Sequence, residues 1–364
     1  MNAKLKALFT TLMIAALVFG YADIYWPLGM YSYERLHVFL FNLCTGGTIL
    51  LFYTKGGESL TFDVLLFFLC SLAYAMSAFF LLYPITILLS FIMAAVVEKI
   101  RITKFSFFPS DFFKKRVPVS AKFHQASLLC LSMGLVISTL VIVNNEYLGL
   151  IHLEKLRLDT FFLGFSFPLS LITLSVVFLM LNSSLALHAK DLAEICFWTI
   201  TLGVIIFFLF ILFEKFIPQI FVTSALFFAV VTVFYLYRKY GEKLQQKYFL
   251  SSGIGFLITT AVTGIIYIFF QMSPGYDPEK IKWLLRLHVF ASLYGWNLCG
   301  FAVICRFNDF PIKLHSGHVI AVHWLTALVL APLGTFYPLF AFLATIGYAF
   351  ITLTLFFSSN QRKT

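Results

Sequence analysis

The sequence predicts an all-α, polytopic membrane protein of about twelve transmembrane helices. Three observations lead to this prediction: 61% of the 364 residues are hydrophobic, only 12% are charged, and the mean hydropathy is +0.94. A water-soluble domain of this size could not cover such a core with polar surface. We therefore expect the chain to lie in the lipid bilayer. The sequence indicates a single integral membrane domain, residues 1–364, without a soluble domain or linker.

Each transmembrane helix needs about 20 apolar residues, and charged or Pro- and Gly-rich breaks divide the chain accordingly. The predicted spans are residues 6–23, 35–54, 60–77, 79–98, 123–143, 157–181, 191–213, 217–237, 249–270, 284–305, 316–334 and 338–358. Lys4 and Lys6 precede the first span as in a signal peptide, but no small-x-small cleavage site follows. We therefore expect the first span to be retained.

The basic residues predict the orientation of these spans. With a cytoplasmic N-terminus, 19 of the 26 Lys and Arg residues fall in cytoplasmic segments, as the positive-inside rule requires. We expect the inner (cytoplasmic) membrane, with the N-terminus and the C-terminus both cytoplasmic. The net charge of +10 then reflects topology, and no nucleic-acid partner is expected. The largest inner loop, 99–122, mixes Phe with Lys and Arg and is predicted to lie on the anionic inner leaflet.

A short motif recurs at the outer ends of three predicted spans. Arg-Leu-His-Val-Phe opens span 2 with Arg35 and His37, and it opens span 10 with Arg286 and His288. Span 6 begins with a degenerate copy, "RLDTF", in which Arg157 is followed by Asp159 at the histidine position. Because these spans are four apart, the sequence predicts a pseudo-threefold arrangement of four-helix units.

Both complete copies also end in Asn-Leu-Cys. Cys44 lies seven residues after His37 and Cys299 lies eleven after His288, so at 100° per residue each cysteine falls about 20° from the face of its histidine. Asn42 and Asn297 have the same relation to the motif arginines. The sequence therefore predicts two matched stripes, despite one extra turn in the second copy.

Two histidines at matched depth on separate spans can ligate a haem iron from both sides. Ionisable residues in spans are costly and normally face the bundle interior. We predict His37 and His288 as axial ligands of one haem b, with Arg35 and Arg286 pairing with its propionates. In the alternative interpretation, the arginines anchor the membrane interface and the histidines bond to neighbouring backbone.

Other polar residues have simpler explanations. Asp277-Pro278-Glu279 and, more weakly, Ser32 are expected to begin helices. Asp159 is read as the cap of span 6. His315, His318 and His323 are expected at the cytoplasmic interface. The six cysteines form no C-x-x-C pair, so neither a zinc site nor a disulfide framework is indicated.

The topology and the two motifs resemble the catalytic subunit I of haem-copper oxidases and nitric oxide reductases. "ERLHVFLFNLCTGG" is similar to the R-x-x-H-T-x-A-x-x-F-x-F-G-G opening of span 2 in the cbb-type members, and "RLHVFASLYGWNLCG" is similar to their H-V-H-S-G-A-L-G-W. The likeness covers about forty residues. It implies that spans 2 and 10 supply the ligands of a low-spin haem.

The sequence also departs from that family. Aligning its Gly-Trp on Gly295-Trp296 places His288 on the first of two family histidines, whereas Phe290 stands at the second, which is the low-spin ligand. Either the register slips by two residues or the bis-histidine haem does not carry over. Asp159 and Phe161 replace the copper-ligating histidine of span 6, and span 7 lacks its His-His pair. We therefore do not expect oxygen or nitric oxide reduction.

The sequence thus predicts electron transfer, sensing or haem handling by one b-type haem, with a membrane or periplasmic redox partner. The alternative is a twelve-span transporter or a membrane assembly factor without haem, in which the Arg-Leu-His motifs anchor and pack the helices.

Overall fold

The computed structural model describes residues 1–57, 59–153, 155–156, 162–181, 187–242, 246–306 and 316–358. The chain is 84% helical, and the described residues form no β-strand. This confirms the all-α prediction. Helix packing divides the chain into two compact units, Met1–Ile172 and Thr173–Thr364, where the sequence had indicated one membrane domain.

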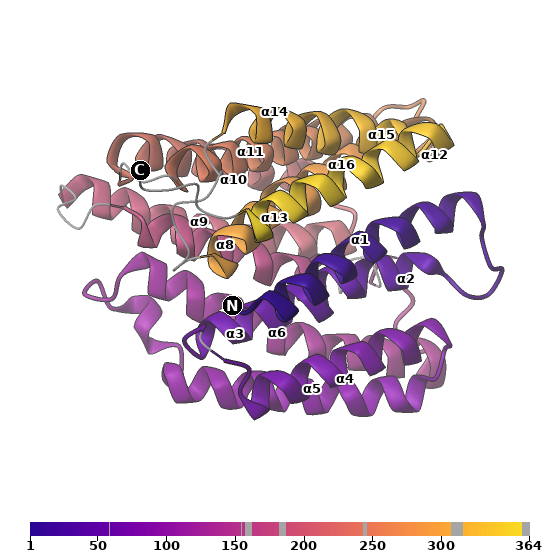
Figure 1. The fold of residues 1–364 in the computed structure, drawn as a ribbon, viewed down its shortest axis with the longest axis horizontal. Helices are drawn as coiled ribbons and strands as arrows, with labels where there is room; N and C mark the ends of the chain where they lie inside the picture. The colour runs from indigo at the N-terminus through magenta and orange to yellow at the C-terminus, as the bar shows by residue number, and fades with distance from the viewer. Residues whose placement is uncertain are drawn as a thin grey trace. The chain divides into compact units, whose positions relative to one another are not determined.

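The first unit contains the N-terminal helices, drawn in indigo to magenta in Figure 1. Its elements are α1 (Ala3–Tyr25), α2 (Tyr33–Val38) with η1 (Phe39–Gly47) and α3 (Thr48–Thr54), α4 (Phe62–Phe79), α5 (Tyr83–Lys104), η2 (Ser110–Phe113), α6 (Val119–Val143) with η3 (Asn144–Leu148), and η4 (Phe162–Ser166) with α8 (Phe167–Leu179). The boundary between the units falls within α8.

The second unit continues with the remaining helices. They are α9 (Leu187–Leu212), α10 (Phe216–Tyr240), α11 (Gln246–Gln271), α12 (Pro278–Phe290) with η5 (Ala291–Asn297) and α13 (Leu298–Cys305), α14 (Gly317–Leu325) with η7 (Thr326–Leu330) and α15 (Ala331–Leu333), and α16 (Pro338–Phe357). In the described residues, each predicted span corresponds to a helix or to a continuous series of helical segments, and for the span 157–181 this part begins at residue 162.

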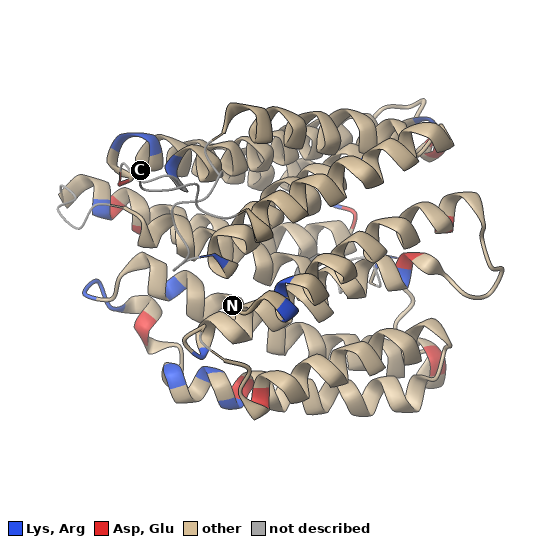
Figure 2. Cartoon of the chain, in the orientation of Figure 1, with Lys and Arg blue, Asp and Glu red and all other residues tan. Residues whose placement is uncertain are grey.

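Nine of the described helices are long and apolar enough to cross a membrane, and two shorter apolar helices, Gly164–Leu179 and Gly317–Leu333, accompany them. Length and composition thus support a multi-pass membrane protein. In the first unit, Lys and Arg gather toward the end where α5 is connected to α6 (Figure 2).

Two predicted helix starts are found, by different means. Asp277 caps α12 as expected, because its carboxylate accepts a hydrogen bond from the Glu279 amide at 3.1 Å and Pro278 occupies the first turn. Ser32 precedes α2 but its hydroxyl makes no cap; it donates instead to Asp23. Asp23, from α1, accepts from the Glu34 amide at 3.0 Å and so supplies the capping oxygen.

A π-helix follows each copy of the repeated motif. η1 begins at Phe39, four residues after the motif arginine. η5 begins at Ala291 and η4 at Phe162, each five residues after the arginine of its own copy. Each of these π-helices packs on the main helix of the preceding predicted span: η1 on α1, η4 on α6 and η5 on α11. Two further π-helices, η3 and η7, occur in the described residues away from the motif, so what distinguishes these three is their place directly after it.

Candidate functional site

His37, on α2, packs against α1. Its Nδ1 lies 2.8 Å from the carbonyl oxygen of Ala16. One turn further along α1, Gly20 leaves room for the imidazole, since a Cβ atom there would stand 2.7 Å from Nδ1. A glycine is therefore required where the ring meets the helix.

His288, on α12, packs against α11 in the same way. Its Nδ1 lies 3.3 Å from the hydroxyl of Thr263, and the carbonyl of Thr260 interacts with the imidazole as well. Gly264 stands beside the ring, where a Cβ would come within 3.3 Å of Cε1. Thr260, which supplies the carbonyl, and Gly264 are four residues apart on α11, as Ala16 and Gly20 are on α1.

The hydrogen bonds fix which nitrogen of each ring carries the proton. A carbonyl oxygen only accepts, so Nδ1 of His37 donates to Ala16. The Thr263 hydroxyl gives its own proton to a main-chain carbonyl, of Thr259 or Thr260, so Nδ1 of His288 donates to it. In both rings Nε2 therefore carries the lone pair, as in a histidine whose other nitrogen is held by a second-shell acceptor.

The matching helices also share a sequence pattern. Residues 14–20 read "IAALVFG" and residues 258–264 read "ITTAVTG", with Ile, Val and Gly at equivalent positions. This similarity was missed in the sequence because three identities in seven residues stand out only when the contacts align them. The repeated feature is thus a pair of helices rather than a motif in one helix.

The motif arginine and histidine of the first copy contact different helices. Arg35 faces α4, where its Nη1 donates to the carbonyl of Ala78 at 2.9 Å, whereas His37 faces α1. Arg35 therefore does not lie beside the imidazole that it was expected to accompany. Arg286 is half-buried on α12. Arg157 and Asp159, in the third copy, lie outside the described residues, as does His315.

The predicted stripes assumed α-helical rotation throughout. Residues Phe39–Gly47 and Ala291–Asn297 are π-helical, so the 100° per residue that aligned Cys44, Asn42 and their counterparts does not apply there. Asn42 is buried on η1, and its side-chain oxygen has no hydrogen-bond partner among the described residues. Asn297 and Trp296 are fully buried at the end of η5, with Trp296 against Gly253 of α11, which indicates a packing role for this tryptophan.

Two further histidines are buried with the opposite ring nitrogen engaged. His323, expected at the interface, is 1% exposed; its Nε2 donates to the carbonyl of Tyr294 at 2.6 Å. That carbonyl belongs to η5, which explains why the imidazole turns inward. His124 donates from Nε2 to Thr54 at 2.8 Å, because the threonine hydroxyl gives its proton to Leu50. Both rings keep the lone pair on Nδ1.

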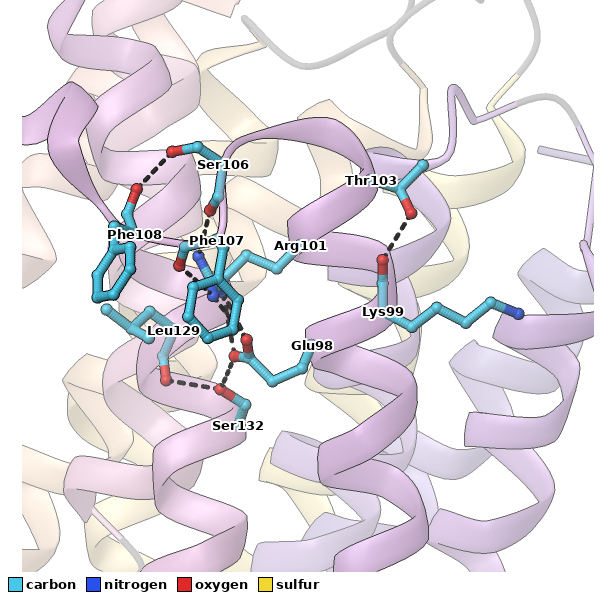
Figure 3. Close-up of polar contacts among 9 residues, drawn as sticks. All are labelled: Glu98, Lys99, Arg101, Thr103, Ser106, Phe107, Phe108, Leu129 and Ser132. Atoms are coloured by element: carbon cyan, nitrogen blue, oxygen red, sulfur yellow. Dashed lines mark hydrogen bonds and ion pairs between the residues drawn. The ribbon is translucent and has the colours of Figure 1, made fainter.

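A charged cluster, absent from the sequence-based site, ties α5 to α6 and to the loop between them (Figure 3). Arg101, 3% exposed, forms an ion pair with Glu98 at 2.6 Å. It also donates to the carbonyls of Ser106 and Phe107 at 2.9 and 3.0 Å, and Ser132 of α6 donates to Glu98. The cluster satisfies a buried guanidinium and holds the start of the loop in place.

The two motif histidines have the ring tautomer that an axial ligand of haem needs. Neutral imidazoles with Nδ1 bonded to a neighbouring helix present Nε2, the nitrogen suited to an axial ligand. The described residues contain no group of three or more His, Cys, Asp or Glu that could hold a metal ion without a macrocycle.

Comparisons with known proteins add nothing to this picture. The chain matches no protein-family model, no curated protein and no solved structure.

Proposed function

We propose that this membrane protein binds one b-type haem, with His37 and His288 as its axial ligands. The observation that supports the proposal is the repeated placement of the two imidazoles, in which Nδ1 donates to the preceding helix and a glycine makes room for the ring. The backbone and threonine contacts orient each ring and hold its proton. A haem ligated by two imidazoles supplies one-electron transfer when bound.

The proposal also includes an arrangement of the spans, an orientation in the membrane and a role. Three helix pairs, each with a π-helix after the Arg-Leu-His/Asp motif, suit a pseudo-threefold bundle of twelve spans. We place it in the inner membrane with cytoplasmic termini, so that the motifs lie at the outer side, within reach of a membrane or periplasmic redox partner. Electron transfer, sensing or haem handling is the corresponding role. The absent copper-site histidines argue against oxidase chemistry.

The test is a reduced-minus-oxidised absorbance spectrum of protein purified after expression with ample haem. We expect the Soret and α bands of a b-type haem, and we expect His37→Ala and His288→Ala each to lose them. His124→Ala and His323→Ala are matched controls, because these buried rings present Nδ1 instead, and both should keep the bands. A haem-free wild-type protein, or bands that persist in His37→Ala, would contradict the proposal.

A transporter or assembly factor without haem is the second candidate, and the division into two compact units favours it. The boundary lies near the middle of the chain, and many transporters are built from two halves. In that case the histidine–glycine contacts only pack the helices. A folded, haem-free protein whose His37→Ala variant loses stability alone would support this candidate.

A further inference from the structure

The first unit contains a cavity of about 100 Å³ that is separate from the histidine contacts. It lies among α2, η1, α4, α5 and the end of α6, and the residues that shape it include Arg35, Tyr74, Tyr83, Ser138, Asn145 and Glu146. In the proposed topology this is the outer end of the unit. We refer to it as the Arg35 cavity.

Arg35 is the strongest donor in this cavity. Its only hydrogen bond to the described part of the chain runs from Nη1 to the carbonyl of Ala78, and it forms no ion pair there. The edge formed by Nε and Nη2 therefore keeps two parallel N–H donors, the geometry that matches the two oxygens of a carboxylate. A half-buried guanidinium without a counter-ion is stabilised by an anion beside it.

Most other polar groups in the wall are engaged with one another. The hydroxyls of Tyr74 and Ser138 are 2.7 Å apart and bond to each other. Thr86 donates to Ser77 or Leu82. Asn145 accepts from the Asn144 amide at 2.9 Å, which leaves its own NH₂ group as a donor. Glu146 and Tyr83 also line the cavity and have interactions of their own, so Arg35 and the Asn145 amide are the donors left to a ligand, and they select one that accepts hydrogen bonds.

The volume of the cavity, its aromatic lining and the charge of Glu146 restrict the kind of ligand that it can hold. An engineered cavity of about 150 Å³ holds benzene, so about 100 Å³ corresponds to roughly four or five non-hydrogen atoms. The aromatic rings of Phe39, Tyr74 and Tyr83 line the cavity and suit a short hydrocarbon tail. Glu146 is exposed and also lines it, so its carboxylate disfavours a doubly charged anion.

We propose that the Arg35 cavity binds a short monocarboxylate, of the size of acetate or propionate. The carboxylate is held by the Nε–Nη2 edge of Arg35 and by the Asn145 amide, and its tail lies against the aromatic wall. The site does not depend on haem, because Arg35 and His37 contact different helices.

The test measures saturable binding of acetate and propionate to the full chain in phosphatidylcholine nanodiscs, by saturation-transfer NMR. We expect binding to weaken at least tenfold in Arg35→Gln, because a charge-assisted bidentate contact is lost. Ala78→Leu should weaken it as well by filling the cavity while Arg35 remains. Lys280→Gln, which removes an outer cation far more exposed than Arg35, should bind as the wild type does.

Three outcomes would overturn the proposal. They are a wild-type chain that binds neither acid, variants Arg35→Gln and Ala78→Leu that both bind as tightly as the wild type, and inorganic phosphate that competes as well as propionate. Phosphatidylglycerol nanodiscs provide a further arm, since displacement of propionate there would identify a lipid phosphate as the occupant instead. His37→Ala separates the two proposals, because it should lose the haem bands and still bind propionate, since Arg35 and His37 contact different helices.

Discussion

At the scale of single residues, the two glycines beside the histidines give the sharpest prediction. A methyl group at Gly20 would overlap Nδ1 of His37, whereas at Gly264 it would make only a tight contact with His288. Overpacking of this kind typically costs about 1–3 kcal/mol. We expect Gly20→Ala to reduce the haem content of the purified protein more than Gly264→Ala does.

Haem per protein, measured by absorbance, checks this order. Gly275→Ala is the matched control, because a Cβ there meets nothing within 4 Å. If Gly20→Ala bound haem at the wild-type level, the ring contact would not be part of the site.

The sequence identified both histidines but not how they are held. Arg35 and His37 are two residues apart on α2 and contact different helices, α4 and α1, which the motif alone does not show. The acceptors, Ala16 and Thr263, carry no distinctive signal in an apolar run. His323 was assigned to the interface because it lies near His315 and His318 at the start of a predicted span. Its partner is a main-chain carbonyl of η5, which no side-chain pattern reveals.

At the scale of elements, α5 shows why charge alone misplaces a helix end. The sequence predicted a span over 79–98, because Glu98, Lys99 and Arg101 resemble a break. The helix continues to Lys104, since Glu98 and two loop carbonyls satisfy the Arg101 guanidinium within the structure. The π-helices could not be predicted either, because their sequences are as apolar as those of the α-helices beside them.

This cluster predicts the behaviour of the loop that follows α5. Arg101→Gln would remove the ion pair and weaken the bonds to Ser106 and Phe107, so the segment carrying Lys114, Lys115 and Arg116 should open more often. We expect trypsin to cleave there at least tenfold faster in nanodiscs. Thr103→Val is the control, because Thr103 bonds only to its own helix, at Lys99. Equal cleavage rates in Arg101→Gln and wild type would show that the cluster does not hold the loop.

The side chains of this loop suit a membrane surface. Phe107, Phe108 and Phe113 are 63%, 72% and 76% exposed, and they stand near the three basic residues. Exposed aromatic and cationic side chains at the end of a span are typical of an interfacial segment on anionic lipid. Contact of this loop with the inner leaflet stays a prediction, with which these exposed side chains are compatible.

At the scale of the whole molecule, apolar runs alone located twelve helical regions, because the bilayer imposes their length and polarity. The division into two compact units was not predictable, since it depends on which helices pack together. The orientation of the spans in the membrane remains a prediction, and it requires that α5 crosses the membrane. This helix is not among the nine candidate spans found in the described residues from length and composition, and without it the alternation of sides would fail.

A labelling experiment on a cysteine-free chain decides whether α5 crosses the membrane. Leu82→Cys precedes α5, Lys115→Cys follows it, and Leu150→Cys follows η3. If the N-terminus is cytoplasmic and α5 spans, an impermeant maleimide should label positions 82 and 150 in right-side-out vesicles, and position 115 only after permeabilisation. Labelling of 82 and 115 from the same side would mean that α5 lies along the surface. The charge count, the common outer side of the two histidines and the outward opening of the Arg35 cavity would then all have to be reassigned.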